Sequence, residues 1–139
     1  MTELDTSKAE LSALLRPDET ITPDSADYQP NIQTWASQKQ LNPRLVIRPT
    51  SVESLGKAVA YLYSTGLDIA IYGRGFMSPS AKDVLINTTA LNDFHFDKHS
   101  ELMTIGAGQT WAEVFRKLGE VAPDYGGMYI LHPSIVGQG

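Results

Sequence analysis

A short glycine-rich segment is the part of this sequence best suited to bind a ligand. Tyr72 ends an apolar run and is followed by Gly73, Arg74 and Gly75. Glycine has no Cβ, so the backbone amides of such a turn can converge on one anion. Arg74 adds a fixed positive charge and Ser78 a hydroxyl donor. The segment therefore suits a phosphate group, although the same pattern is common in tight turns that bind nothing.

Two familiar phosphate-binding patterns do not fit this segment. No Gly-Lys-Ser/Thr sequence follows, so it is not a Walker A loop, and Ser78 stands where the dinucleotide fingerprint needs its third glycine. From the residues alone, a ligand loop and a structural turn both stay open.

The histidines and Trp111 favour no catalytic or metal site. His95 and His99 lie in an alternating segment, where an i,i+4 pair would span about 13 Å, too far for one metal ion. We interpret both as surface residues. His132 is interpreted as a solvated loop residue, with a ligand contact as the alternative, and Trp111 as a core residue rather than a stacking platform. No nucleophile elbow is visible.

Composition limits the classes of function. The chain has 139 residues, the size of one ordinary domain, and a net charge of −5, which argues against a nucleic-acid partner. It has no cysteine, which excludes disulfides, thiolate metal sites and cysteine nucleophiles. The N-terminal residues lack the basic and apolar regions of a signal peptide, and no apolar run would span a membrane. We expect a cytoplasmic protein.

The first region, residues 1–43, is predicted to be a helix and an arm. A short helix is expected over residues 7–15, ended by Pro17. The proline-rich stretch after it is expected to be an extended arm or loop, anchored on the following domain by Tyr28, Ile32 and Trp35.

The second region, residues 44–139, alternates strands and helices. Strands are predicted over 45–48, 68–72, 84–87 and 102–105, with an edge strand beginning at Phe94. A capping box of Thr50 and Glu53 predicts a helix up to about residue 65, capped by Gly66 in the left-handed conformation. A parallel strand–helix–strand unit then leads into the glycine segment. Its helix is expected to bury Leu55, Ala58, Val59 and Leu62.

A second helix follows a glycine break at residues 106–108. A capping box of Thr110 and Glu113 predicts its start and Gly119 its C′ residue. Its apolar side is expected to hold Trp111, Val114, Phe115 and Leu118.

Three blocks of this second region, residues 43–53, 69–78 and 83–114, resemble the start of a known flavoprotein domain. In order and spacing they are similar to the FAD-binding domain of vanillyl-alcohol-oxidase-type flavoproteins, the group that includes berberine bridge enzyme-like oxidases. The resemblance implies an α+β, PCMH-type FAD-binding domain, with its first α/β subdomain complete and its second truncated.

The resemblance also implies which residues bind FAD. The pyrophosphate would be wrapped by Tyr72, Gly73, Arg74, Gly75, Phe76, Met77 and Ser78, and a second glycine-rich stretch near the flavin begins with Val136, Gly137 and Gly139. In this family the loop often ends in a histidine bonded to the flavin. Phe76 occupies that position here, and the other common tether, a cysteine, is absent. FAD is therefore expected to bind without a covalent bond.

The resemblance implies an oxidoreductase acting on a small organic molecule, such as a secondary metabolite. The alternative is a flavin-free relative that serves as a binding or cyclisation scaffold, or as half of an assembly; a coincidental small α/β domain is a third possibility. The family domain continues beyond the part matched here, and a substrate domain follows it. We therefore expect a fragment, inactive alone, or a chain whose truncated edge is covered by a protein partner or by self-association.

Overall fold

The computed structural model describes residues 1–34, 36–74 and 79–125, and within them a central four-stranded sheet. Its strands lie in the order β1 (Thr20–Ile21), β2 (Leu45–Ile47), β4 (Val84–Asn87) and β3 (Ile69–Tyr72). β2 and β3 are both parallel to β4, and β1 is antiparallel to β2. The predicted strand–helix–strand unit is therefore present, but β4 lies between its two strands.

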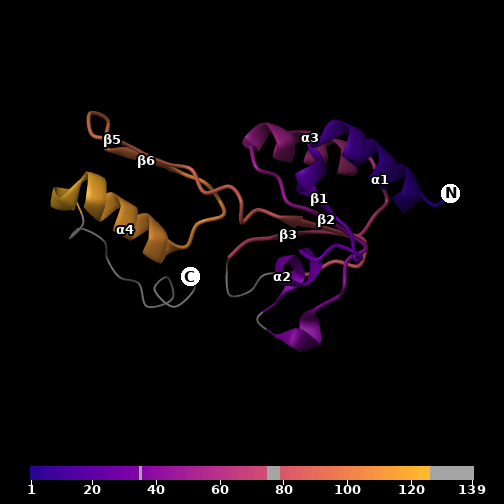
Figure 1. The fold of residues 1–139 in the computed structure, drawn as a ribbon. Helices are drawn as coiled ribbons and strands as arrows, with labels where there is room; N and C mark the ends of the chain where they lie inside the picture. The colour runs from indigo at the N-terminus through magenta and orange to yellow at the C-terminus, as the bar shows by residue number, and fades with distance from the viewer. Residues whose placement is uncertain (35, 75–78, 126–139) are drawn as a thin grey trace.

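Helices cover both faces of this sheet (Figure 1). α1 (Glu3–Leu14) and α3 (Val52–Leu62) pack on the face that carries Leu45, Ile47 and Ile86. α2 (Tyr28–Ile32) packs on the opposite face, against Val46 and Leu85. Because β2 and β4 are buried on both faces, they are continuous apolar runs apart from Asn87 at the end of β4, as is typical of parallel strands.

A second, smaller unit lies beside the sheet (Figure 1). β5 (Phe94–Asp97) and β6 (Leu102–Ile105) form an antiparallel pair, and α4 (Trp111–Val121) packs against β5. Burial alternates along both strands because only one face of the pair is covered. Short 3-10 turns occur at η1 (Pro17–Glu19), η2 (Ser37–Lys39) and η3 (Pro123–Tyr125).

The N-terminal arm is more structured than its sequence predicted. α1 begins at Glu3 rather than at residue 7, because Thr2 and Asp5 form a capping box. The arm then supplies η1, β1 and α2 instead of remaining extended. Its anchoring by Tyr28 and Ile32 is confirmed, since both are buried and the Tyr28 hydroxyl donates to the Pro43 carbonyl at 2.6 Å. Trp35 lies outside the described residues.

The predicted capping box at the start of α3 is wrong. Ser51 is the N-cap residue, and its side chain accepts from the Ser54 amide at 3.1 Å. The Thr50 hydroxyl instead donates to the buried carboxylate of Glu19 at 2.6 Å. Glu53 forms an ion pair with Lys57, one turn later in α3. A long-range partner thus replaces the local one.

The end and the buried side of α3 also differ from the prediction. The helix is capped at Tyr63, and the Gly66 amide donates to Glu3 Oε1 at 3.0 Å. No glycine in the described part of the chain has a positive φ, so Gly66 is not a left-handed cap. Val59 is 42% exposed, because Ala58 and Leu62 already fill the contact with the sheet.

In α4 the predicted capping box is confirmed, and two other predictions are wrong. Thr110 Oγ1 accepts from the Glu113 amide at 3.2 Å, and the Glu113 carboxylate accepts from the Thr110 amide at 2.8 Å. Gly119 lies inside the helix, which continues to Val121. Trp111 is not a core residue: it is 43% exposed and stacks on Phe115 with ring centroids 5.8 Å apart.

Candidate functional site

The start of the glycine segment is fixed at the carboxyl end of two parallel strands. β3 leads directly into Gly73, and Tyr72 lies opposite Asn87 of β4. The Thr88 amide and hydroxyl both donate to the Tyr72 carbonyl, at 2.9 and 3.0 Å. Ligands of open α/β sheets characteristically bind at this edge. The predicted segment therefore begins where a ligand loop should begin.

Gly73 brings this segment close to a second turn. A Cβ at Gly73 would lie 3.6 Å from Thr88 Oγ1 and 3.9 Å from the Ala107 carbonyl oxygen. The missing side chain thus leaves a small space between the end of β4 and the turn that follows β6.

That second turn, residues 106–108, requires glycine at both ends. A Cβ at Gly106 would lie 2.2 Å from the Leu91 carbonyl oxygen, and one at Gly108 would lie 2.4 Å from the Thr88 carbonyl oxygen. The Gly108 amide donates to Leu91 at 2.8 Å. Two backbones therefore pass each other without room for a side chain. The sequence indicated only a break here, although the Gly-x-Gly spacing was the available signal.

Arg74 joins the segment to the first turn of α4. Its Nη1 lies 3.1 Å from Glu113 Oε1, and both side chains are about half-exposed. The pKa of Glu113 is lowered, chiefly by the hydrogen bond from the Thr110 amide, with the charge of Arg74 adding to the effect. The end of β3, the 106–108 turn and the start of α4 thus converge on one place.

The structure describes three of the predicted site residues. Tyr72 and Gly73 are half-buried and Arg74 is exposed, all at this point of convergence. The others lie outside the described residues: Gly75, Phe76, Met77, Ser78, Val136, Gly137 and Gly139.

The histidines do not join the site. His95 on β5 and His99 in the turn after it are exposed, which confirms them as surface residues, while His132 lies outside the described residues. Among the residues whose placement is described, no group of His, Asp and Glu could hold a metal ion. None of the helices in that part of the chain is long and apolar enough to cross a membrane.

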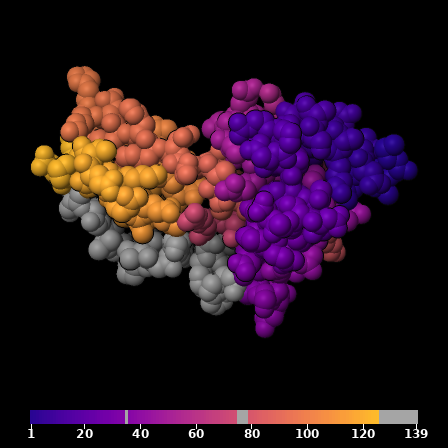
Figure 2. Space-filling view, in the orientation of Figure 1, coloured from indigo at the N-terminus to yellow at the C-terminus, as the bar shows by residue number. Residues whose placement is uncertain are grey.

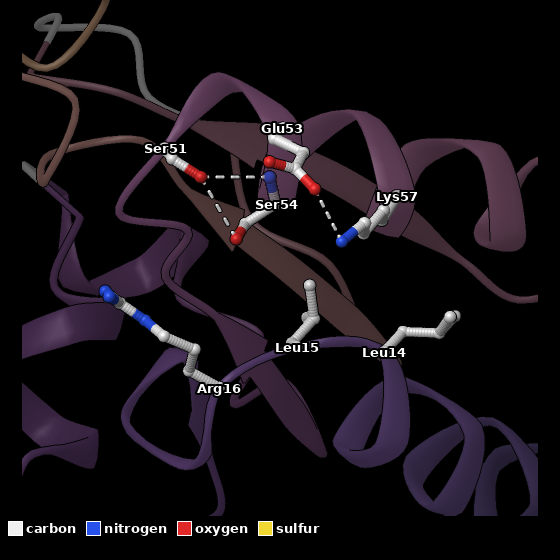
Figure 3. A pocket seen from close by; sticks show the side chains of 7 residues that line it. All are labelled: Leu14, Leu15, Arg16, Ser51, Glu53, Ser54 and Lys57. Atoms are coloured by element: carbon white, nitrogen blue, oxygen red, sulfur yellow. Dashed lines mark hydrogen bonds and ion pairs between the residues drawn. The ribbon is translucent and has the colours of Figure 1, made fainter.

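A hollow between α1 and α3 holds no unsatisfied charge that would favour a ligand (Figure 3). Its volume is about 360 Å³. Glu53 and Lys57 form an ion pair at 2.7 Å on its rim, Arg16 pairs with Asp18 at 3.6 Å, and Leu15 is buried beneath. Its charges are therefore already balanced by neighbours.

Comparison with known proteins identifies the domain. A family described as FAD binding domain matches residues 43–137. The chain belongs to this family. FAD-dependent monooxygenase prx3 of Penicillium roqueforti is 33% identical over 109 residues, which are 73% of this chain and 21% of prx3. FAD-dependent monooxygenase yanF of Aspergillus niger is 26% identical over 114 residues, 77% of this chain and 20% of yanF. The chain thus spans about a fifth of the length of these curated relatives.

Solved flavoenzymes share the fold. Wild-type BBE-like 1 of Physcomitrella patens superposes with a TM-score of 0.65 at 19% identity, over 86% of this chain and 26% of that one. Phl p 4.0202, a glucose dehydrogenase, gives a TM-score of 0.72 at 16% identity, over 85% and 27%. CrmK, a flavoenzyme of caerulomycin biosynthesis, gives 0.63 at 19%, over 73% and 21%. The predicted family and the α+β fold of an N-terminal FAD-binding subdomain are confirmed.

Proposed function

We propose that this chain supplies the FAD-binding part of an oxidoreductase that oxidises a small organic molecule of the secondary-metabolite kind, and that it holds FAD without a covalent bond. The observation that carries the proposal is the convergence of Gly73, Arg74 and the 106–108 turn at the carboxyl edge of a parallel sheet. The membership of residues 43–137 in an FAD binding domain family supports it.

The residues at this edge fit a pyrophosphate. Gly73 leaves open a space that a Cβ would occupy, and Arg74 carries a positive charge at the same turn. Arg74 donates one hydrogen bond to Glu113, and a guanidinium has five N–H donors, so it can also donate to a phosphate. FAD, when bound, would supply the chemistry by accepting a hydride from the substrate. The chain itself would fix the position of the cofactor.

Residue chemistry supports binding without a covalent tether. Phe76 stands where the resembling enzymes often have a flavin-bonded histidine, and the sequence contains no cysteine. A phenyl ring has no atom that could attack the flavin. Non-covalent binding makes the cofactor removable, which gives the proposal a direct test.

The test is reconstitution with FAD. We expect protein incubated with FAD to keep an absorbance band near 450 nm through gel filtration and to release it on denaturation. Gly73→Val should weaken FAD binding because it fills the space beside Thr88 and Ala107. Gly56→Val is the matched control, since nothing lies within 4 Å of a Cβ there. Folded wild-type protein that retains no FAD, or unchanged binding by the valine variant, would overturn the proposal.

The same titration separates the flavin-free alternative, which Phe76 motivates. In that case the chain stays folded, as circular dichroism would show, while FAD neither coelutes nor changes its fluorescence. A folded protein without FAD affinity would therefore favour a binding scaffold over a redox domain.

A further inference from the structure

A second cavity lies on the face of the sheet that α2 covers. Its volume is about 370 Å³, within the lower range of small-ligand sites. Arg48, directly after β2, and Thr89, after β4, line it from the sheet. Asp18, Ile21 and Asp27 line it from the N-terminal arm. Its lining includes no residue of the 72–74 segment or the 106–113 segment, and the arm precedes the part that matches the FAD family.

Arg48 offers a nearly unused guanidinium to this cavity. Its backbone amide is held by the Glu19 carbonyl at 2.8 Å, which fixes the residue at the end of β2. Its Nε donates to Thr89 Oγ1 over a long 3.4 Å. Across residues 1–34, 36–74 and 79–125, no carboxylate forms an ion pair with Arg48. A planar guanidinium with free donors is suited to a carboxylate.

The arm side of the cavity carries the opposite charge. Asp18 is already paired with Arg16 at 3.6 Å, but the carboxylate of Asp27 accepts no hydrogen bond from any described residue. A simple anion in this cavity would meet two carboxylates as well as Arg48. A ligand with separate negative and positive groups satisfies both sides.

We propose that this cavity binds a small zwitterion of the amino-acid type. Its carboxylate would pair with Arg48 and its ammonium group with Asp27, with Asp18 adding to the negative field. Ile21 and Pro30, which also line the cavity, would contact an apolar side chain. The cavity shares no residue with the 72–74 or 106–113 segments, but Thr89 lies against Gly108 of the candidate flavin site, so the experiments include FAD as a competitor.

The first experiment uses the ligand to dissect the two charges. The full chain is titrated by calorimetry with each standard amino acid, then with the methyl ester and the N-acetyl derivative of the tightest binder. The ester removes the carboxylate and the acetyl group removes the ammonium charge. We expect each derivative to bind about tenfold more weakly or worse, as for the loss of one charged hydrogen bond. A folded protein that binds no standard amino acid overturns the proposal.

The second experiment uses the protein. Arg48→Gln should weaken binding of the free amino acid and abolish its advantage over the ester, and Asp27→Asn should abolish its advantage over the acetyl form. Asp24→Asn is the control, because Asp24 is exposed on the arm and does not line the cavity. If Arg48→Gln does not fold, the ester comparison on wild-type protein decides. Displacement of the amino acid by FAD, with equal weakening of both by Arg48→Gln, would assign the cavity to the flavin site and overturn the proposal.

Discussion

At the scale of single residues, Glu19 is the most consequential polar group in the described core. Its carboxylate is fully buried and accepts from the Thr50 amide at 2.7 Å, from the Thr50 hydroxyl at 2.6 Å and from the Arg16 amide at 3.1 Å. Burial alone would raise its pKa, but these hydrogen bonds outweigh burial and lower the pKa to about 2. The ionised carboxylate thus ties the arm to the loop before α3.

This lowered pKa makes stability depend on pH in a defined direction. The folded pKa lies below the unfolded value of about 4.3, so the stabilisation is complete above that value and is lost as pH falls toward 2. The shift corresponds to about 3 kcal/mol of unfolding free energy. We expect Glu19→Gln to be destabilised by a similar amount at pH 7 and to lose less stability than wild type below pH 4. Urea unfolding at several pH values measures both.

Glu10→Gln is the matched control for that measurement. Glu10 is exposed on α1, and we expect its substitution to change the unfolding free energy very little. Equal acid sensitivity of wild type and Glu19→Gln would show that another group governs the pH dependence.

Substitutions at two glycines are expected to change the stability of the fold in opposite directions. Gly108→Ala should destabilise the fold and abolish FAD retention, because its Cβ would lie 2.4 Å from the Thr88 carbonyl oxygen and backbone would have to move. Gly119→Ala should stabilise by about 0.5–1 kcal/mol, because Gly119 lies within α4 and nothing lies within 4 Å of its Cβ. Thermal unfolding of the pair tests this, and equal melting temperatures would contradict it.

Residue type predicted a role well where the partner was local in sequence, and poorly where it was distant. The Thr110–Glu113 capping box was predictable because both members lie in one helical turn. The same pattern at Thr50 failed because Glu19, 31 residues away, binds its hydroxyl. Helical spacing predicts Trp111 in the core. It is instead the half-exposed first residue of α4, a helix that covers only the β5–β6 pair.

At the scale of elements, α4 links the stability of the small unit to the candidate site. Thr110 caps the helix and holds Glu113, and Glu113 in turn holds Arg74. Loss of the cap should therefore affect both the helix and the position of the glycine segment.

We expect Thr110→Ala to lower the unfolding free energy by about 1 kcal/mol. It should also weaken FAD binding, because the Glu113 amide loses its acceptor, Thr110 Oγ1, and the first turn of α4 that places Glu113 beside Arg74 is loosened. Ser12→Ala, at an exposed position of α1, is the control that should leave FAD affinity unchanged and should not lower the unfolding free energy. An unchanged FAD affinity in a folded Thr110→Ala protein would show that α4 does not position the segment.

The strands show which elements sequence can predict. β4 was recognised because burial on both faces requires a continuous apolar run, and β5 because burial on one face produces alternation. β1 was missed because its two residues become a strand only by pairing with β2. The placement of β4 between β2 and β3 was likewise not predictable, because hydrophobic pattern does not specify strand order.

At the scale of the whole molecule, the arm and the family-matched domain form one folded body. Figure 2 shows the indigo-to-purple arm filling one side of the molecule and the orange-to-yellow β5–α4 unit the other. The arm covers both faces of the sheet, with Leu11 of α1 on one and Ile32 of α2 on the other, both fully buried. The proposed amino-acid cavity also depends on the arm, which supplies Asp18 and Asp27.

We therefore expect residues 43–139 alone not to fold stably, although they contain the whole family match. Each buried arm side chain contributes up to about 1.5–3 kcal/mol, and the arm supplies Leu4, Leu11, Leu15, Ile21, Tyr28 and Ile32. Their summed loss is comparable to the entire stability of an ordinary domain, about 5–15 kcal/mol. Circular dichroism of the shortened protein should show no cooperative melting, and adding a peptide of residues 1–42 should restore it.

A matched pair within α1 separates this packing role from a simple effect of length. Leu11→Ala removes a fully buried side chain and should cost about 2–5 kcal/mol, whereas Leu14→Ala removes one that is 42% exposed and should cost much less. If the shortened protein melts cooperatively at the wild-type temperature, and Leu11→Ala is as stable as Leu14→Ala, the arm is an appendage. If both destabilise as expected, the proposed flavin-binding edge depends on the arm, which holds β2 and β4 in a closed core. Loss of the arm should then abolish FAD retention without changing any residue of the 72–78 segment.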